Sequence, residues 1–91
     1  MNFVQLCGEV GTWSVKNFGE QAPDNPLLGV LEEIGAISHS VLKMDQGIRG
    51  THEEHMASIA DGVADAVVFL ADFCFRADIV KSFGGRPMLN E

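Results

Sequence analysis

The stretch from about His52 to Ala77 constrains the fold more than any other part of the chain, because nearly all of its circumference is apolar. If it forms one helix, at about 100° per residue, four of its acidic residues fall within about 40° of one another. These residues are Glu54, Asp61, Asp65 and Asp72, and Arg76 lies beside them. A helix with so much apolar surface belongs inside a bundle. The acidic stripe is then either its solvated side or part of a site.

Composition favours the association of several copies. The chain has 91 residues, which is at the small end of what can bury a core alone. A hydrophobic content of 46% and a mean hydropathy of +0.12 are high for a short chain with a net charge of −7. We therefore expect a single domain that closes its apolar surface against further copies of itself, as a homodimer or homotetramer.

Charge and motif content exclude several classes of function. The 13 acidic residues against 6 lysines and arginines argue against a nucleic-acid-binding module, which would carry a basic patch. A polyphosphate substrate is compatible with this balance only if a divalent cation mediates its binding. We expect no membrane span and a cytosolic setting, because the chain has no long apolar run and no basic leader. Glycine-loop, Walker-type, HExxH and nucleophile-elbow patterns are all absent from the sequence.

The two cysteines are predicted to be reduced core residues. Cys7 and Cys74 stand in apolar surroundings and form no CxxC pair. We therefore expect neither a metal site nor a disulfide from them.

A first helix is predicted over about residues 2–18, where apolar residues recur at spacings of three and four. Trp13 and Lys16, near the end of this helix, can line a site. Otherwise the pattern places Trp13 in the core, and Lys16 is simply a solvated charge. Gly8 and Gly11 weaken the helix, but they also let another helix approach closely.

A second helix is predicted over about residues 26–44, after a loop rich in helix-stopping residues. Its regular apolar seam, expected to be buried, consists of Val30, Ile34, Ile37, Val41 and Met44. Glu33 borders this seam, so it is the acid that we expect to face an interhelical groove. Glu32 lies further round the same helix and can reach the groove from its edge.

The third helix, over about residues 52–77, has a clear beginning. Thr51 can cap it, and Glu54 completes a capping box, which is a sufficient structural explanation for that acid. His52 and His55 lie near this start and are expected to be exposed. After Ala77 the pattern breaks up, and residues 82–91 are predicted to be a flexible C-terminal tail.

Two helices joined by a short turn pack antiparallel, so Glu33 can face Asp61 and Asp65 across a groove. Carboxylate oxygens are the ligands that Mg²⁺ prefers, and Mn²⁺ is a possible substitute. Without a cation, clustered carboxylates repel and raise one another's pKa; with Mg²⁺ they form a template for a polyphosphate. The chemistry that follows is attack of water on phosphorus.

Two segments carry a family resemblance. PLLGVLEEIGAISHSVLK over residues 26–43 and IADGVADAVVFL over residues 59–70 resemble the MazG-like all-α nucleoside triphosphate pyrophosphohydrolases, with their motif pair EExxE and ExxD. The resemblance implies an all-α bundle of three main helices, completed to a four-helix type by homo-oligomerisation. It also implies Mg²⁺-dependent cleavage between the α and β phosphates, giving a monophosphate and pyrophosphate. Glu32 and Glu33 take the paired glutamates, and Asp65 takes the motif aspartate.

Two motif positions depart from the family pattern. The last glutamate of the first motif is Ala36, and the first glutamate of the second motif falls on Gly62. Asp61 lies four residues before Asp65 on the same helical face, so it can replace the ligand missing at Gly62. Nothing comparable replaces the carboxylate missing at Ala36.

Five further residues are candidates for substrate binding. Phe69, one turn after Asp65, can stack on a nucleobase or can belong to the core. Asp72 can hydrogen-bond a base or ribose, or can simply be exposed. Lys16 and Arg76 can neutralise phosphates, as Lys43 also can, or can be surface charges.

We therefore expect a Mg²⁺-dependent pyrophosphohydrolase, with Glu33, Asp61 and Asp65 as metal ligands and Glu32 as a fourth ligand or a water-orienting base. The alternative is a catalytically degenerate relative that binds nucleotides or proteins, with Ala36 marking the lost activity. A helical oligomerisation domain without a ligand is a third interpretation.

Overall fold

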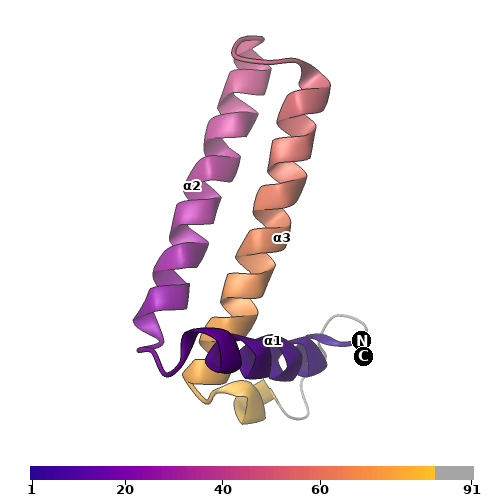
Figure 1. The fold of residues 1–91 in the computed structure, drawn as a ribbon. Coiled ribbons are helices and arrows are strands. Elements are labelled where there is room, and N and C mark those ends of the chain that lie inside the picture. Colours follow the sequence, from indigo (N-terminus) through magenta and orange to yellow (C-terminus); the bar gives the residue numbers. More distant parts are fainter. Residues whose placement is uncertain (84–91) are drawn as a thin grey trace.

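The computed structural model describes residues 1–83, and within that part the chain is all-helical, as predicted (Figure 1). The helices are α1 (Phe3–Phe18), α2 (Asp24–Gln46), α3 (His52–Arg76) and the short 3₁₀ helix η1 (Val80–Phe83). The two residues at the start of the predicted tail, Ser82 and Phe83, belong to η1. The rest of that tail lies outside the described residues.

Local capping explains where α1 and α3 begin. Asn2 accepts a hydrogen bond from the backbone N–H of Gln5, and the Gln5 side chain accepts one from the backbone of Asn2. Thr51 and Glu54 form the same reciprocal arrangement at α3, so the predicted capping box is confirmed. The backbone N–H of Thr51 donates to the Glu54 carboxylate at 2.9 Å and lowers the pKa of that carboxyl.

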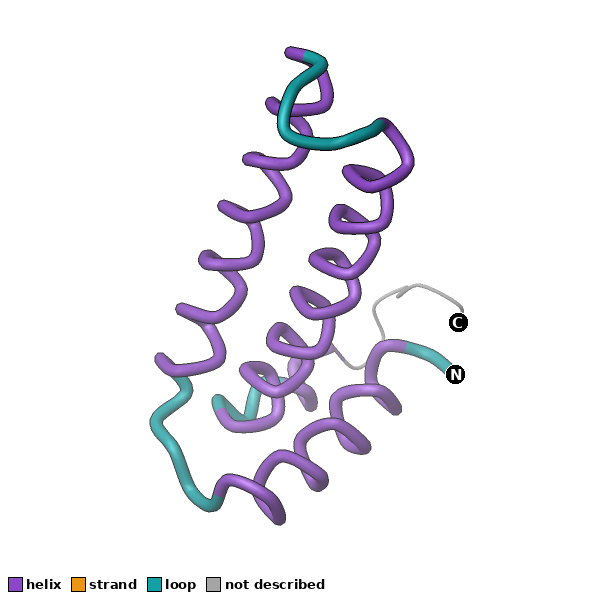
Figure 2. Tube along the Cα trace, turned by 45° about the horizontal axis from the view of Figure 1, so that its top comes forward, coloured by secondary structure: helices purple, strands orange, loops and turns teal. Residues whose placement is uncertain are grey.

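The two long helices, α2 and α3, form an antiparallel hairpin, and α1 crosses it near one end (Figures 1 and 2). Glycines set the closest approaches. A Cβ on Gly29 of α2 would lie 2.7 Å from the Phe69 ring of α3, and a Cβ on Gly62 of α3 would lie 2.7 Å from Ile37. A Cβ on Gly11 would overlap the side chain of Phe75, so Gly11 lets α1 pack directly on α3.

The core of a single chain is small and lies where α1 crosses α3. Its buried hydrophobic residues, within residues 1–83, are Cys7, Ala71 and Cys74. The Cα radius of gyration is 15.3 Å, against about 12 Å for a compact chain of this length. The extents of 44 × 30 × 17 Å describe a flat, elongated molecule. Among residues 1–83, no third helix covers most of the hairpin (Figure 1).

Two packing predictions need correction. The seam of α2 is only partly buried in one chain, since Ile34 is 50% exposed and Val41 is 39% exposed. Trp13, predicted to be in the core, is 52% exposed and contacts Phe18 edge-on with ring centroids 5.5 Å apart. The reason is that α1 contacts α3 through Cys7, Gly11 and the residues around them, which turns Trp13 away from that contact.

The prediction that His55 is exposed is also wrong. Its side chain is buried beneath the turn between α2 and α3, and Nε2 donates to the carbonyl oxygen of Ile48 at 2.9 Å. This bond ties the turn to the first residues of α3. His52, by contrast, is exposed, as predicted.

Both cysteines are buried and free, as predicted. Burial, and secondarily the neighbouring Cys74, raises the pKa of the Cys7 thiol to about 11. Burial also raises the pKa of Cys74. The two thiols lie against each other between α1 and α3, in the small core.

Iodoacetamide at pH 8 is expected to modify Cys7 at least about 100-fold more slowly in the folded protein than in urea. Raising the pKa from 9.0 to about 11 lowers the fraction of reactive thiolate by about that factor, and burial blocks access as well. A time course by intact-mass spectrometry measures both rates. Equal rates in the two conditions would show that the α1–α3 core is open in solution.

No helix within residues 1–83 has both the length and the apolar character needed to cross a bilayer.

Candidate functional site

A cavity of about 510 Å³ lies between α1, the loop after it, and the facing sides of α2 and α3. Three aromatic side chains line it, namely Trp13 and Phe18 from the end of α1 and Phe69 from α3. Three carboxylates line it, of Glu33 from α2 and of Asp65 and Asp72 from α3. Its volume is within the usual range for a site that binds a small molecule.

The Glu33 carboxylate lies in the groove between α2 and α3, as predicted from the helical wheel. Its Oε2 would be 3.8 Å from a Cβ placed on Gly62. Gly62 lies between Asp61 and Asp65 along α3, so Glu33 reaches the stretch of α3 that carries both acids. The absence of a side chain at Gly62 leaves room for Glu33 and Ile37 to approach this stretch.

The other predicted carboxylates lie further from the cavity. Asp61 and Glu32 are exposed, and neither lines the cavity wall. Within residues 1–83, no three His, Cys, Asp or Glu side chains of one chain gather closely enough to hold a metal ion. The structure therefore brings Glu33, Asp65 and Asp72 to one cavity and leaves Asp61 one turn away on α3. Ala36 is exposed on the surface of α2.

Asp72 and Arg76, both predicted to contact substrate, bind each other, and Asp72 also lines the cavity. Arg76 Nε donates to Asp72 Oδ1 at 2.9 Å, and the two side chains are 3% and 11% exposed, respectively. Ser14 Oγ donates to Asp72 Oδ2 at 2.7 Å and accepts a hydrogen bond from Arg76 at 2.8 Å. Asp72 is buried, so its interpretation as an exposed side chain is wrong.

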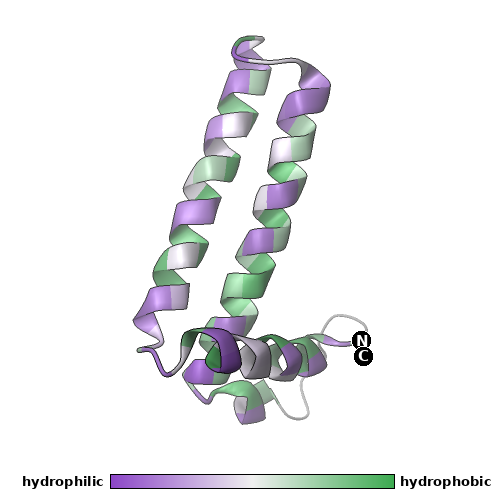
Figure 3. Cartoon of the chain, in the orientation of Figure 1, coloured by the Kyte–Doolittle hydropathy of each residue, from purple (hydrophilic) through white to green (hydrophobic). Residues whose placement is uncertain are grey.

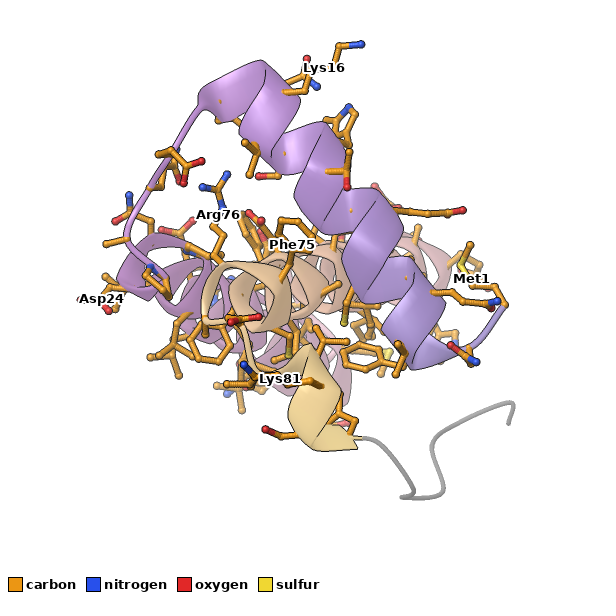
Figure 4. All side chains as sticks on the ribbon, turned by 90° about the horizontal axis from the view of Figure 1, so that it is seen from below. Met1, Lys16, Asp24, Phe75, Arg76 and Lys81 are labelled. Carbon is orange, nitrogen blue, oxygen red and sulfur yellow. The ribbon has the colours of Figure 1, made fainter. Side chains whose placement is uncertain are left out.

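The Ser14–Asp72–Arg76 network also holds the end of α1. Arg76 donates a further hydrogen bond to the carbonyl oxygen of Gly19, the residue that ends α1, at 2.9 Å. In Figure 4 the Arg76 side chain points from α3 toward this end of α1. Trp13 and Phe18 lie on the same part of α1, so the network fixes the aromatic wall of the cavity in place.

Lys16 lies away from the cavity that contains the acids. It is exposed and points outward from the end of α1 (Figure 4). It lines a second hollow of about 480 Å³ on the far side of this end of α1, together with Arg76. Phe69, in contrast, lines the first cavity and packs against Gly29 at the same time.

Sequence reasoning missed Ser14 and Phe18 as parts of the site. Ser14 stands four residues after Val10 and seven after Cys7, so it shares the buried face of α1. A polar side chain on a buried face needs a hydrogen-bond partner, and that was the available signal. Phe18 carried no comparable signal, since its position in the cavity depends on the turn after α1.

No family model, curated protein or solved structure matches this chain. The family resemblance thus depends on the two motif segments, and the geometry of the cavity has to be argued from its own residues.

Proposed function

We propose that the protein is a Mg²⁺-dependent nucleotide pyrophosphohydrolase, acting on a nucleoside or deoxynucleoside triphosphate between the α and β phosphates. The observation that carries this proposal is a cavity lined by three aromatic rings and three carboxylates, two of which, Glu33 and Asp65, make no ion pair within residues 1–83. Carboxylates at one part of the wall suit a metal-bound triphosphate, while Trp13, Phe18 and Phe69 offer faces on which a base can stack.

The donor set fits a Mg²⁺ ion. Mg²⁺ commonly takes one or two protein carboxylates and completes its six positions with waters and substrate phosphate oxygens. Glu33 and Asp65 supply two such carboxylates, and Asp61 is a third within one helical turn. When bound, the ion supplies polarisation of the phosphoryl oxygens and offsets the charge of the triphosphate.

The protein groups have separate roles in this proposal. Glu33, Asp61 and Asp65 bind the metal, and Glu32, exposed beside Glu33, orients the attacking water from the rim or acts as a fourth ligand. Phe69 is held by its contact with Gly29, so its ring is positioned before substrate arrives. The network of Asp72 and Arg76 holds α1 in place instead of binding phosphate.

The proposed active form is a homo-oligomer. Its support is the small core, together with large hydrophobic side chains that stay exposed along both long helices. Figure 3 shows hydrophobic segments along the whole length of α2 and α3. A chain with this surface is more stable as an assembly than alone.

A second candidate function is that of a catalytically degenerate binding module. Ala36 lies exposed where the family motif has a carboxylate, and within residues 1–83 no three potential ligands gather in one chain. Such a module would keep the aromatic cavity and bind a nucleotide without cleaving it.

Pyrophosphate release from a panel of ribo- and deoxynucleoside triphosphates tests the proposal. We expect release with Mg²⁺ or Mn²⁺, none with excess EDTA, and a preference for one base or sugar. The absence of pyrophosphate release with every triphosphate, from protein shown to be folded by circular dichroism, would contradict the enzymatic proposal. Metal-dependent nucleotide binding by the same inactive protein, measured by calorimetry, would favour the binding module.

A further inference from the structure

The cavity residues of the two long helices fall into three successive levels along the hairpin. On α2, Asn25, Gly29 and Glu33 follow one another every four residues, about 6 Å apart along the axis and on one side of the helix. Gly29 contacts the Phe69 ring of α3. Because the two helices are antiparallel, Glu33 lies opposite Asp65, one turn before Phe69. The carboxylates of Glu33 and Asp65 therefore form one level, Phe69 the next, and the amide of Asn25 the third.

The Phe69 ring occupies the space that a side chain at position 29 would fill. A Cβ placed on Gly29 would lie 2.7, 2.8 and 2.9 Å from three carbon atoms of the ring, closer than van der Waals contact allows. An aromatic ring is rigid, so it would have to swing away from α2 as a whole. Phe69 lines the cavity, which is the open space beside it. The width of the cavity at this level thus depends on the absence of a side chain at Gly29.

The aromatic wall from α1 does not compensate for a change at this level. Trp13 and Phe18 pack edge-on, with ring centroids 5.5 Å apart and planes at 85°. Next to Phe18, the carbonyl oxygen of Gly19 accepts a hydrogen bond from the buried Arg76 side chain. These contacts hold the end of α1, so the space left for a flat ligand is set by the position of Phe69.

The end of the cavity beyond Phe69 carries uncharged polar groups. Gln21 and Asn25 line the cavity, and within residues 1–83 neither side-chain amide has a hydrogen-bond partner. An amide offers both a donor and an acceptor, which match the amino group and the neighbouring ring nitrogen of adenine. Among residues 1–83, no lysine or arginine lines this cavity. This end therefore suits a neutral base and not a phosphate.

The separation of the levels favours a base with two rings. Asn25 and Glu33 are eight residues apart, which is about 12 Å along α2. In the proposed function, metal-bound phosphates at Glu33 and Asp65 fix one end of the nucleotide. A base stacked on Phe69 then has to reach the amides at the other end. A purine extends further from its sugar than a pyrimidine and offers a larger face for stacking.

We propose that Gly29 makes the cavity selective for purine nucleotides, because it leaves the Phe69 ring drawn back against α2 and so opens the space that a two-ring base needs. In this inference Phe69 contacts the base, and Gly29 is a positioning residue that acts through Phe69. The inference rests on the proposed function for the place of the phosphates. It concerns binding of the base, however, and not cleavage.

Fluorescence of Trp13, the one tryptophan of the chain, provides the test, because this side chain lines the cavity. The full chain is titrated with adenosine and uridine 5′-monophosphates in the presence of Mg²⁺, which measures binding without turnover. We expect the wild type to bind the adenosine nucleotide at least about 10-fold more tightly than the uridine nucleotide. In Gly29→Ala, affinity for the adenosine nucleotide should fall at least about 10-fold and affinity for the uridine nucleotide less than about 3-fold.

Gly35→Ala is the matched control. It adds the same methyl group to α2 and the same gain in helix propensity, but a Cβ on Gly35 would meet no atom within 4 Å. Both affinities should therefore stay unchanged. Circular dichroism of each variant checks that the helices are retained.

A double variant separates placement of the ring from general damage to the hairpin. Phe69→Ala removes the ring, so it should weaken the adenosine nucleotide more than the uridine nucleotide. Adding Gly29→Ala to Phe69→Ala should cause no further loss, since no ring is left to displace. This pair keeps the test valid if Gly29→Ala alone does not fold. A further loss in the double variant would overturn the role assigned to Gly29.

The outcomes distinguish this inference from the catalytic proposal. Equal affinity of the wild type for the two monophosphates, or a preference that Gly29→Ala leaves unchanged, would overturn the inference alone. Purine-selective binding without pyrophosphate release from any triphosphate would support the inference and overturn the catalytic proposal. A folded chain that binds neither monophosphate and releases no pyrophosphate would overturn both.

Discussion

Asp72→Asn is expected to lower the free energy of unfolding by about 3–5 kcal/mol, the cost of leaving one member of a buried ion pair without its partner. The variant leaves the Arg76 guanidinium buried beside a neutral amide, while Ser14 loses its charged acceptor. For a domain of this size the corresponding fall in Tm is more than about 12 °C. Thermal unfolding followed by circular dichroism, at one fixed protein concentration, measures it.

Asp78→Asn is the matched control. It removes the same charge from an exposed pair with Lys81, whose atoms are 3.5 Å apart and whose side chains are 77% and 84% exposed. Asp78 has a positive φ of 56°, which asparagine tolerates, so the backbone is not strained by the change. The expected loss is at most about 1 kcal/mol. A loss for Asp72→Asn as small as this would show that the network does not hold α1 to α3.

The elements of the fold could be predicted because their signals are local. Apolar periodicity and the Thr51 cap placed the three helices within two residues of their observed ends. Glu33 could be placed in the groove because the wheel position of a residue depends only on its own helix. Of the two glycines predicted to let another helix approach, Gly11 does so, since it contacts Phe75, whereas a Cβ on Gly8 would meet no atom within 4 Å.

The errors concern contacts that a residue makes outside its own helix. Periodicity gives a helix an apolar side, but it does not say where along its length another helix crosses. Trp13 was therefore placed in the core, although α1 meets α3 mainly through Cys7, Gly11 and Ser14. His55 was misjudged for the same reason, since its burial depends on a turn that folds back over the start of α3.

The candidate site shows the same limit. The sequence indicated an acidic stripe on α3, but only tertiary structure separates its members. Both Asp65 and Asp72 line the cavity, but Asp65 is exposed, whereas Asp72, two turns later, is buried and binds Ser14 and Arg76. Two carboxylates on one helical face, about 10 Å apart along the helix axis, can thus have different roles, one chemical and the other structural.

Asp65→Asn is expected to slow pyrophosphate release about 100–1,000-fold while leaving helicity unchanged, since loss of one preorganised charge at a reacting centre has an effect of that order. Asp65 is exposed and makes no ion pair within residues 1–83, so its replacement removes a metal ligand without opening the core. Steady-state rates with saturating Mg²⁺, beside circular dichroism spectra, measure both quantities.

Asp45→Asn removes the same charge at the end of α2 farthest from the cavity and should retain full activity. Unchanged turnover in Asp65→Asn would show that Asp65 is not part of the active site. Loss of helicity would show that its role is structural.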